Sequence, residues 1–301
     1  MGLIHRLGLE PARRGVILHA DDVGMCHGAN TAFVELSRIG ALTCGSVMVP
    51  CPWFPEIAHI AAAETTLDLG VHLTLTSEWP SYRWGPLTRA GAGSGLVDDD
   101  GYFPRTVAAL AAAVDPGAAE LEMRAQVDRA LSFGIDVTHI DTHMGAALSP
   151  PLLDAYCRIG NDYRLPVVLP RDSRHCAEVL KLDMPGWRET LDAAVARLDA
   201  GHMPLVDDFR MTPGVPHAES DAAYRSLVSG LPAGLTFLAL HPNAPGDIEA
   251  IVPPRAHFRT DEYRLLRSGA VSEAVAAGGI QTIGMRALRD LWRRQKQHVA
   301  P

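Results

Sequence analysis

Apolar and β-branched residues recur in short runs along the chain, and most runs precede a stretch with apolar residues three and four positions apart. The first pattern is typical of buried strands and the second of helices packed on a sheet. We expect strands at Gly15–Ala20, Thr43–Val49, Leu67–Leu75, Val137–Asp141, Pro166–Leu169, Pro204–Asp208, Leu235–His241 and Ile280–Ile283. We expect helices at Ala29–Ile39, Phe54–Ala63, Ala118–Phe133, Pro151–Arg164, Trp187–Leu198, Ser220–Val228, Asp261–Ala277 and Gly284–Gln297.

The alternation of strand and helix predicts a parallel sheet whose strands are joined by right-handed helical crossovers. We therefore expect an α/β fold: a single-domain, TIM-like (β/α) barrel of seven or eight parallel strands, regular or distorted. An open doubly wound sheet is the alternative, because the last expected strand is weak. No linker divides the chain, so one domain covers residues 1–301. The longest irregular stretch, Ser77–Phe103, has the length of an active-site loop.

Ionisable side chains sit at the ends of four expected strands. They are Asp21 and Asp22 after the first strand, His72 near the end of the third, His143 just past the fourth and His241 at the end of the seventh. In a parallel barrel the carboxyl ends of all strands lie on one rim, where catalytic groups gather. We therefore expect these side chains to share one site.

Side-chain alternation adds detail at the fourth strand. Successive residues of an extended chain point to opposite faces, so His139, Asp141 and His143 point the same way. His143 can then reach a metal while Asp141 or His139 supports it.

The adjacent carboxylates of Asp21 and Asp22 have a chemical rationale. One can bind a cation while its neighbour accepts a proton from metal-bound water, whose pKa falls from ~15.7 towards ~7. One carboxylate and two imidazoles leave positions open for water and substrate, as a catalytic zinc site requires. The two side chains diverge in a regular strand. Both enter one site only if the backbone turns, which Gly24 permits.

Each candidate also has a structural interpretation. Asp21 and Asp22 can cap the following helix or form an Asx-turn, and His72, between apolar neighbours, can be a core histidine. His19 alternates with apolar residues inside the first strand, and we expect it to be structural. Cys26 can be a ligand or a small buried thiol.

Three residues are candidates for contact with a substrate. Arg171, after the fifth expected strand, is a candidate clamp. Trp79 and Trp84 on the long loop can stack on a sugar ring or simply pin the loop. The acidic run Asp98–Asp100 on the same loop is expected to be a solvated turn rather than a cation site.

Composition excludes several other classes of function. The formal net charge is −8 and lysines and arginines do not cluster, so we expect no nucleic-acid partner. No apolar run reaches 18 residues, so we expect no membrane span. Residues 1–14 lack the apolar centre of a secretory signal. The five cysteines form no C-x-x-C pair, which predicts reduced thiols in a cytoplasmic protein.

Four motifs, in order, resemble those of the YdjC-like (ChbG/HpnK) carbohydrate deacetylases. The run ADDVG at 20–24 is similar to A-D-D-F-G, and GVHLTLT at 70–76 to G-x-H-x-x-L-T. HIDTH at 139–143 is similar to H-x-D-[ST]-H, and the pair at 241–242 to a late H-P element. The chain departs from the family at Val23, where Phe is usual, and at Met144, where further histidines usually follow.

The resemblance implies a barrel-like fold and metal-dependent removal of the acetyl group from an N-acetylated sugar. Carried over to this sequence, it implies the following roles: Asp21 as general base, Asp22, His72 and His143 as metal ligands, and His241 as general acid for the departing amine. The departures leave this ligand set intact. Because of these departures, the resemblance supports deacetylation more strongly than it supports a chito-oligosaccharide as the substrate.

The expected cofactor is one divalent ion. Two imidazoles favour Zn²⁺ or a similar ion such as Co²⁺, whereas a lone carboxylate with waters also suits Mg²⁺. The expected partner is a small carbohydrate; the sequence does not determine the oligomeric state, and a homodimer is one option. Two alternatives stay open: a phosphoesterase or other metal-dependent hydrolase, and a catalytically silent sugar-binding protein of the same fold. A phosphoesterase usually needs two metals or cationic clamps, and the chain has few lysines.

Overall fold

The computed structural model describes residues 3–8, 14–180, 184 and 186–298. The strands are β1 (Arg14–Val23), β2 (Cys44–Val47), β3 (Leu69–Leu73), β4 (Val137–Thr142), β5 (Asp208–Met211), β6 (Gly234–Leu240) and β7 (Gln281–Thr282). The α-helices are α1 (Leu3–Arg6), α2 (His27–Arg38), α3 (Phe54–Ala63), α4 (Val107–Ala113), α5 (Pro116–Ser132), α6 (Leu153–Tyr163), α7 (Ser173–Leu180), α8 (Trp187–Ala200), α9 (Ser220–Ser229), α10 (Asp247–Ile251), α11 (Ala256–Arg267), α12 (Ala270–Ala277) and α13 (Met285–His298). The 3₁₀ turns are η1 (Ala92–Ser94), η2 (His143–Leu148) and η3 (His217–Glu219).

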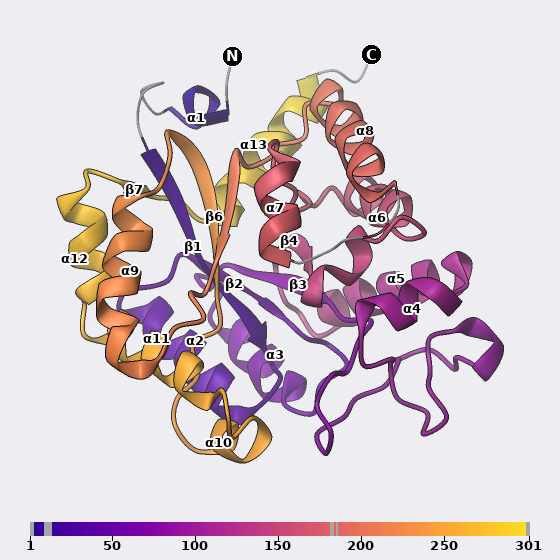
Figure 1. The fold of residues 1–301 in the computed structure, drawn as a ribbon. Coiled ribbons are helices and arrows are strands. Elements are labelled where there is room, and N and C mark those ends of the chain that lie inside the picture. The colour runs from indigo at the N-terminus through magenta and orange to yellow at the C-terminus, as the bar shows by residue number, and fades with distance from the viewer. Residues whose placement is uncertain (1–2, 9–13, 181–183, 185, 299–301) are drawn as a thin grey trace.

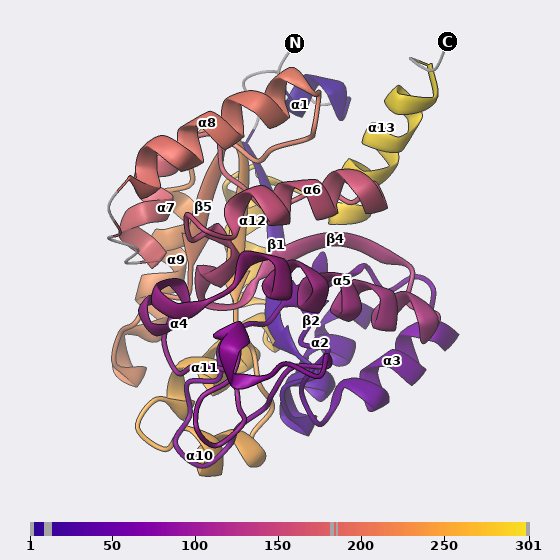
Figure 2. The same cartoon turned by 90° about the vertical axis from the view of Figure 1, so that its right-hand side faces the viewer.

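The strands pair in parallel in the order β4-β3-β2-β1-β6-β5, and β7 adds to β1. Strand β1 is central: one edge pairs with β6, and the other is shared by β7 near its start and β2 near its end. Figures 1 and 2 show the helices around the outside of the sheet, from α9 and α12 on one side to α5, α6 and α8 on the other. This arrangement confirms the predicted parallel α/β fold.

An irregular segment connects the two outer strands β4 and β5. One isolated bridge joins Ile140 of β4 to Val167, and another joins Pro170 to Val206, just before β5. The fifth expected strand is reduced to these bridges because Pro166 and Pro170 have no amide hydrogen to donate to a ladder. The molecule is therefore a distorted barrel in which the regular strands do not close.

Alternate residues of β1 face opposite sides of the sheet. Val16 and Leu18 pack in the large apolar cluster that includes the surrounding helices. Ile17 belongs to a second buried cluster together with Phe237 of β6. His19 lies next on this inner face, with its ring centroid 4.6 Å from that of Phe237. The barrel interior thus becomes polar towards the carboxyl ends of the strands.

Several expected boundaries are wrong. The strand expected at residues 204–208 begins only at Asp208, as β5. The helix expected over 261–277 is two helices, α11 and α12, separated at Gly269, which has a φ of 84°. The short helices α1, α4, α7 and α10, of four to eight residues, are too brief to give a periodic signal.

The cysteines match the expectation of free thiols. All five are buried and none forms a disulfide. Within the residues described above, no helix is both long enough and apolar enough to cross a lipid bilayer. The expected absence of a secretory signal falls partly on residues 1–2 and 9–13, which lie outside the described residues.

Gly70 of β3 lies against the ring of His139, which gives a stability prediction. A Cβ at this residue would lie 2.5 Å from Cε1 of the buried His139 ring. We expect Gly70→Ala to lower the free energy of unfolding by about 1–3 kcal/mol, the usual range for overpacking. The midpoint of urea denaturation should fall while the m value stays constant. Gly91→Ala is the matched control, because Gly91 is exposed and no atom lies within 4 Å of its added Cβ. Equal losses in the two variants would refute the packing argument.

Candidate active site and metal centre

Strand β1 ends in a turn that brings two adjacent carboxylates together. The register between β1 and β2 shifts between Ala20 and Val23, and Asp22 has a φ of 60°. A positive φ is uncommon outside glycine, and aspartate is among the few residues that tolerate it. Gly24, with a φ of 87°, continues the turn. As a result Asp21 and Asp22 line the same cavity instead of facing opposite sides of the sheet.

Asp22, His72 and His143 come together from the ends of β1 and β3 and the start of η2. Asp22 Oδ1 lies 3.1 Å from His143 Nδ1 and 3.5 Å from His72 Nε2. Two ligands bound 2.0–2.1 Å from a tetrahedral ion lie roughly 3.3 Å apart. All three side chains are buried, and their ligand atoms lie within 4.8 Å of one another. The residues therefore fit one divalent ion.

The second ring nitrogen of His72 is held by a hydroxyl and a carboxylate. Ser46 Oγ donates to Asp141 Oδ2 at 2.9 Å and lies 3.1 Å from His72 Nδ1. Asp141 Oδ1 lies 2.9 Å from the same nitrogen. Since Ser46 donates its only hydroxyl proton to Asp141, its oxygen accepts a hydrogen bond from His72 Nδ1–H. This assignment leaves Nε2 free to bind a metal, the arrangement typical of ligating histidines.

The outward-facing atoms of the other two ligands are held as well. Glu78 Oε2 lies 3.0 Å from His143 Nε2, and Arg259 Nη2 donates to Asp22 Oδ2 at 2.7 Å. Carboxylates that accept from the second nitrogen of a ligating histidine fix its ring and raise its basicity. Each of the three candidate ligands thus has its non-coordinating side occupied by a specific partner.

The cluster concentrates opposite charges in a buried place. Burial opposes the charge of Asp22, but Arg259 and His143 outweigh it and hold the pKa of Asp22 well below its ordinary value. Burial lowers the pKa of His143, whereas Glu78 and Asp22 raise it more strongly, to about 9. These two carboxylates favour the protonated ring, so a metal ion that binds His143 would displace a proton.

Asp21 stands beside this cluster with a different set of partners. Its Oδ1 lies 2.6 Å from His19 Nδ1, and its Oδ2 lies 3.7 Å from His241 Nε2. Both Asp21 and His241 are partly exposed and line the cavity. The structure thus brings together all five ionisable residues expected at the barrel rim.

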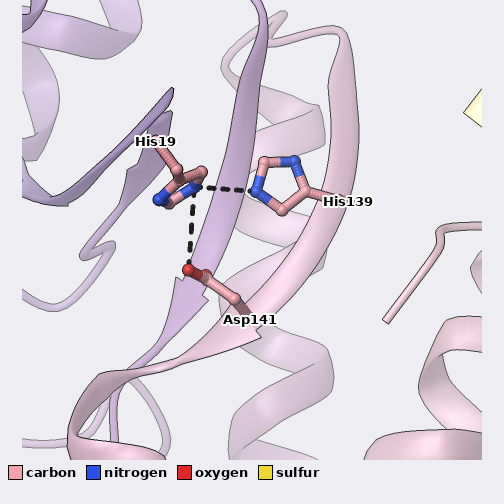
Figure 3. A group of neighbouring side chains, drawn as sticks. All are labelled: His19, His139 and Asp141. Atoms are coloured by element: carbon pink, nitrogen blue, oxygen red, sulfur yellow. Dashed lines mark hydrogen bonds and ion pairs between the residues drawn. The ribbon is translucent and has the colours of Figure 1, made fainter. Parts of the chain in front are cut away.

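A second group of potential ligands lies deeper in the barrel (Figure 3). His19 Nε2 is 3.0 Å from His139 Nε2 and 3.7 Å from Asp141 Oδ2. The remaining nitrogens are also engaged, because His19 Nδ1 meets Asp21 and His139 Nδ1 meets Thr138 Oγ1 at 3.0 Å. Burial lowers the pKa of His139 to about 3, so its ring is neutral. This group is an internal hydrogen-bond chain that supports Asp21. The expected support of His143 is wrong for both candidates, because His139 contacts His19 and Asp141 contacts His72 and His19.

The site opens into a cavity of about 780 Å³, within the range of small-molecule sites. The long loop contributes Glu78 and Trp79 to its wall, and Arg105 follows just after the loop. Much of the remaining wall is apolar, formed by Leu148, Val168, Pro170, Cys176, Val179, Leu180, Phe209, Met211 and Phe237.

Two residues expected to contact a substrate lie elsewhere. Arg171 pairs with Asp199 at 2.7 Å and lies 3.5 Å from Asp207, where it lines a separate surface hollow. Its guanidinium is engaged outside the cavity and cannot clamp a ligand there. Trp84 is buried, and its Nε1 donates to the carbonyl of Thr76 at 2.8 Å. Trp84 therefore pins the loop, the second of the two roles considered for it.

Ser46, Glu78 and Arg259 are not predicted as site residues by the sequence. Its position in the sequence could have indicated Glu78 as a site residue, because it lies two residues beyond the 70–76 motif. Ser46 is one small polar residue in an apolar strand. Arg259 belongs to a helix 237 residues from its partner Asp22, and no local pattern connects the two.

Comparison with known proteins agrees with this geometry. A family model described as YdjC-like protein matches residues 15–277. The chain belongs to the YdjC-like family. This YdjC-like chain is 37% identical to a carbohydrate deacetylase from Thermus thermophilus over 289 residues, 91% of this chain and 100% of that protein. It is 34% identical to a carbohydrate deacetylase from Brevibacillus brevis over 155 residues, 52% of this chain and 59% of that protein.

A solved structure supports the fold. An Enterococcus faecalis protein named for cellobiose-phosphate cleavage has a TM-score of 0.75 to this YdjC-like chain and is 22% identical. The match covers 92% of this chain and 99% of the other. At this identity the likeness shows a shared fold and no shared activity.

The contact between Glu78 and His143 predicts a metal-affinity defect. We expect Glu78→Gln to weaken divalent-metal binding by about 10–100-fold, the usual effect of losing the carboxylate behind a ligating histidine. Calorimetric titration of Zn²⁺ into chelator-treated protein measures the change. Glu189→Gln serves as the control, since Glu189 is an exposed residue of α8. If both variants bind Zn²⁺ as tightly as the unaltered chain, Glu78 does not support a metal ligand.

Proposed function

We propose that this chain is a metal-dependent carbohydrate deacetylase that hydrolyses the acetamide of an N-acetylated amino sugar or oligosaccharide. The observation that carries this proposal is the cluster of Asp22, His72 and His143 in one cavity with Asp21, a carboxylate that stands outside the cluster. The similarity to proteins named carbohydrate deacetylase supports the same activity.

Asp22 Oδ1, His72 Nε2 and His143 Nδ1 are the proposed ligands of the ion. When bound, a divalent ion supplies Lewis acidity to the acetamide carbonyl and lowers the pKa of water. A donor set of two imidazoles and one carboxylate suits Zn²⁺ or Co²⁺, with Mg²⁺ as the harder alternative. The cytoplasmic location stays a prediction.

Asp21 is the proposed general base and His241 the proposed general acid. His19 holds Oδ1 of Asp21 at 2.6 Å, so Oδ2 is the oxygen free to take a proton from the attacking water. His241 Nε2 lies 3.7 Å from that oxygen, and we assign to it the protonation of the amine nitrogen as the C–N bond breaks. The products are acetate and a free amino sugar.

The wall of the cavity suits a ring with one apolar face. Trp79 of the long loop is half-buried in this wall, where it can pack on a pyranose ring. Other apolar residues of the wall, among them Leu148 and Phe209, extend this apolar surface.

An acetate-release screen tests the activity. The protein, loaded in turn with Zn²⁺, Co²⁺ and Mg²⁺, should release acetate and a free amine from at least one N-acetylated mono- or oligosaccharide. Chelator treatment should abolish the release, and one of the metals should restore it. Release of phosphate from sugar phosphates without acetate would favour a phosphoesterase. Tight sugar binding without either product would identify a silent sugar-binding protein.

Replacement of the proposed base separates catalysis from metal binding. Asp21→Asn should lower kcat by roughly 10²–10⁴-fold, the usual contribution of a general base. Metal content by elemental analysis should stay unchanged, because Asp21 is not one of the three proposed ligands. Asp99→Asn, at an exposed position of the long loop, is the control. Full activity of Asp21→Asn would overturn the assignment of the base.

A further inference from the structure

A chain of hydrogen bonds runs away from the cavity behind His241. Thr212 Oγ1, just past β5, lies 2.8 Å from His241 Nδ1 and donates to Glu262 Oε1 at 2.6 Å. Glu262, on α11, is fully buried. Its Oε1 also accepts from the hydroxyl of Tyr224, and its Oε2 accepts from the backbone N–H of His241. Thr212 and Glu262 contact His241 directly and Tyr224 contacts Glu262, and none of the three has a role in the reaction described above.

Counting protons assigns the direction of each bond. In its charged form the Glu262 carboxylate only accepts, so the single proton of the Thr212 hydroxyl goes to Glu262. The lone pair of Thr212 Oγ1 that faces His241 must then accept, which requires a proton on His241 Nδ1. The same count leaves the other nitrogen, Nε2, as the one that takes up or releases a proton on the cavity side.

We propose that Thr212 and Glu262 are positioning residues that lock His241 in the Nδ1–H tautomer and direct its Nε2 at the departing amine. This inference rests on the proposed deacetylase function. The proton that Asp21 takes from water passes across 3.7 Å to His241 Nε2 and then to the amine nitrogen, so the step consumes no external acid. The C–N bond breaks as that N–H bond forms, and His241 returns to its neutral form.

The electrostatics of the chain agree with this assignment. Burial lowers the pKa of His241 below its ordinary value, although Asp21 and Asp22 act against this, and so favours the neutral ring. A neutral ring has one protonated and one bare nitrogen, and its tautomer therefore decides whether Nε2 can accept a proton. Burial raises the pKa of Glu262 to about 7, against the hydrogen bonds from its three donors, so above this pH the carboxylate is charged, as the assignment requires.

Helix α11 orients two parts of the site at once. Arg259 and Glu262 are three residues apart and lie on the same face of the helix. Arg259 holds the outer oxygen of Asp22, and Glu262 holds the backbone and, through Thr212, the ring of His241. The proposed metal ligand and the proposed acid are therefore fixed by one rigid element.

The test compares Thr212→Val, which removes the hydroxyl at nearly constant volume, with Thr212→Ser, which keeps it. We expect Thr212→Val to lower kcat for acetate release by about 10–100-fold, as for a misplaced catalytic group, with KM within about twofold of the unaltered chain. Thr212→Ser should recover most of the loss. Nitrogen NMR of the imidazole, assigned with a His241→Asn variant, should show the Nδ1–H tautomer in the unaltered chain and a mixture in Thr212→Val. Thr282→Val, on the exposed strand β7, controls for loss of a threonine hydroxyl.

Two results would overturn the inference. One is a Thr212→Val protein with unchanged kcat and tautomer; the other is a Thr212→Ser protein as impaired as Thr212→Val. Absence of acetate release from the unaltered chain would instead count against the proposed function, and the NMR comparison would still test the hydrogen-bond chain on its own.

Discussion

The site depends on the turn that ends β1. Because Asp22 has a positive φ, two neighbouring carboxylates enter one cavity although a regular strand would send them to opposite faces. Asp22 then meets two imidazoles and an arginine, while Asp21 meets a separate pair of histidines. The conformation of this one turn thus places Asp22 among groups suited to hold a cation and Asp21 among groups suited to move a proton.

The general rules for parallel barrels are enough to predict, from the sequence, which residues at the strand ends form the site. Asp21, Asp22, His72, His143 and His241 gather because strand ends of a parallel sheet share one rim. That rule predicts the position of the backbone but not the direction in which a long side chain points. For this reason the sequence makes Arg171 and Trp84 candidates for contact with a substrate, whereas neither lines the cavity in the structure.

The remaining partners of the site could not be inferred locally. Arg259 and Glu262 lie on a helix near the end of the chain, and Thr212 follows β5, so their roles arise only from long-range packing. The sequence predicts a barrel that is regular or distorted, but it does not locate the irregularity, because residues 166–170 look like a strand although their two prolines lack amide donors. Periodicity reports which side chains are buried and carries no information on hydrogen-bond partners from distant elements.

The long loop has a consequence for how specificity can change in this protein. Barrel enzymes acquire new substrates mainly by alteration of the loops after their strands. Here Glu78 and Trp79, two consecutive residues of one loop, serve different purposes: one holds a proposed metal ligand and the other forms part of the cavity wall. A change in this loop that alters the contact with substrate can therefore also remove the support of His143. A replacement loop must supply another carboxylate next to His143.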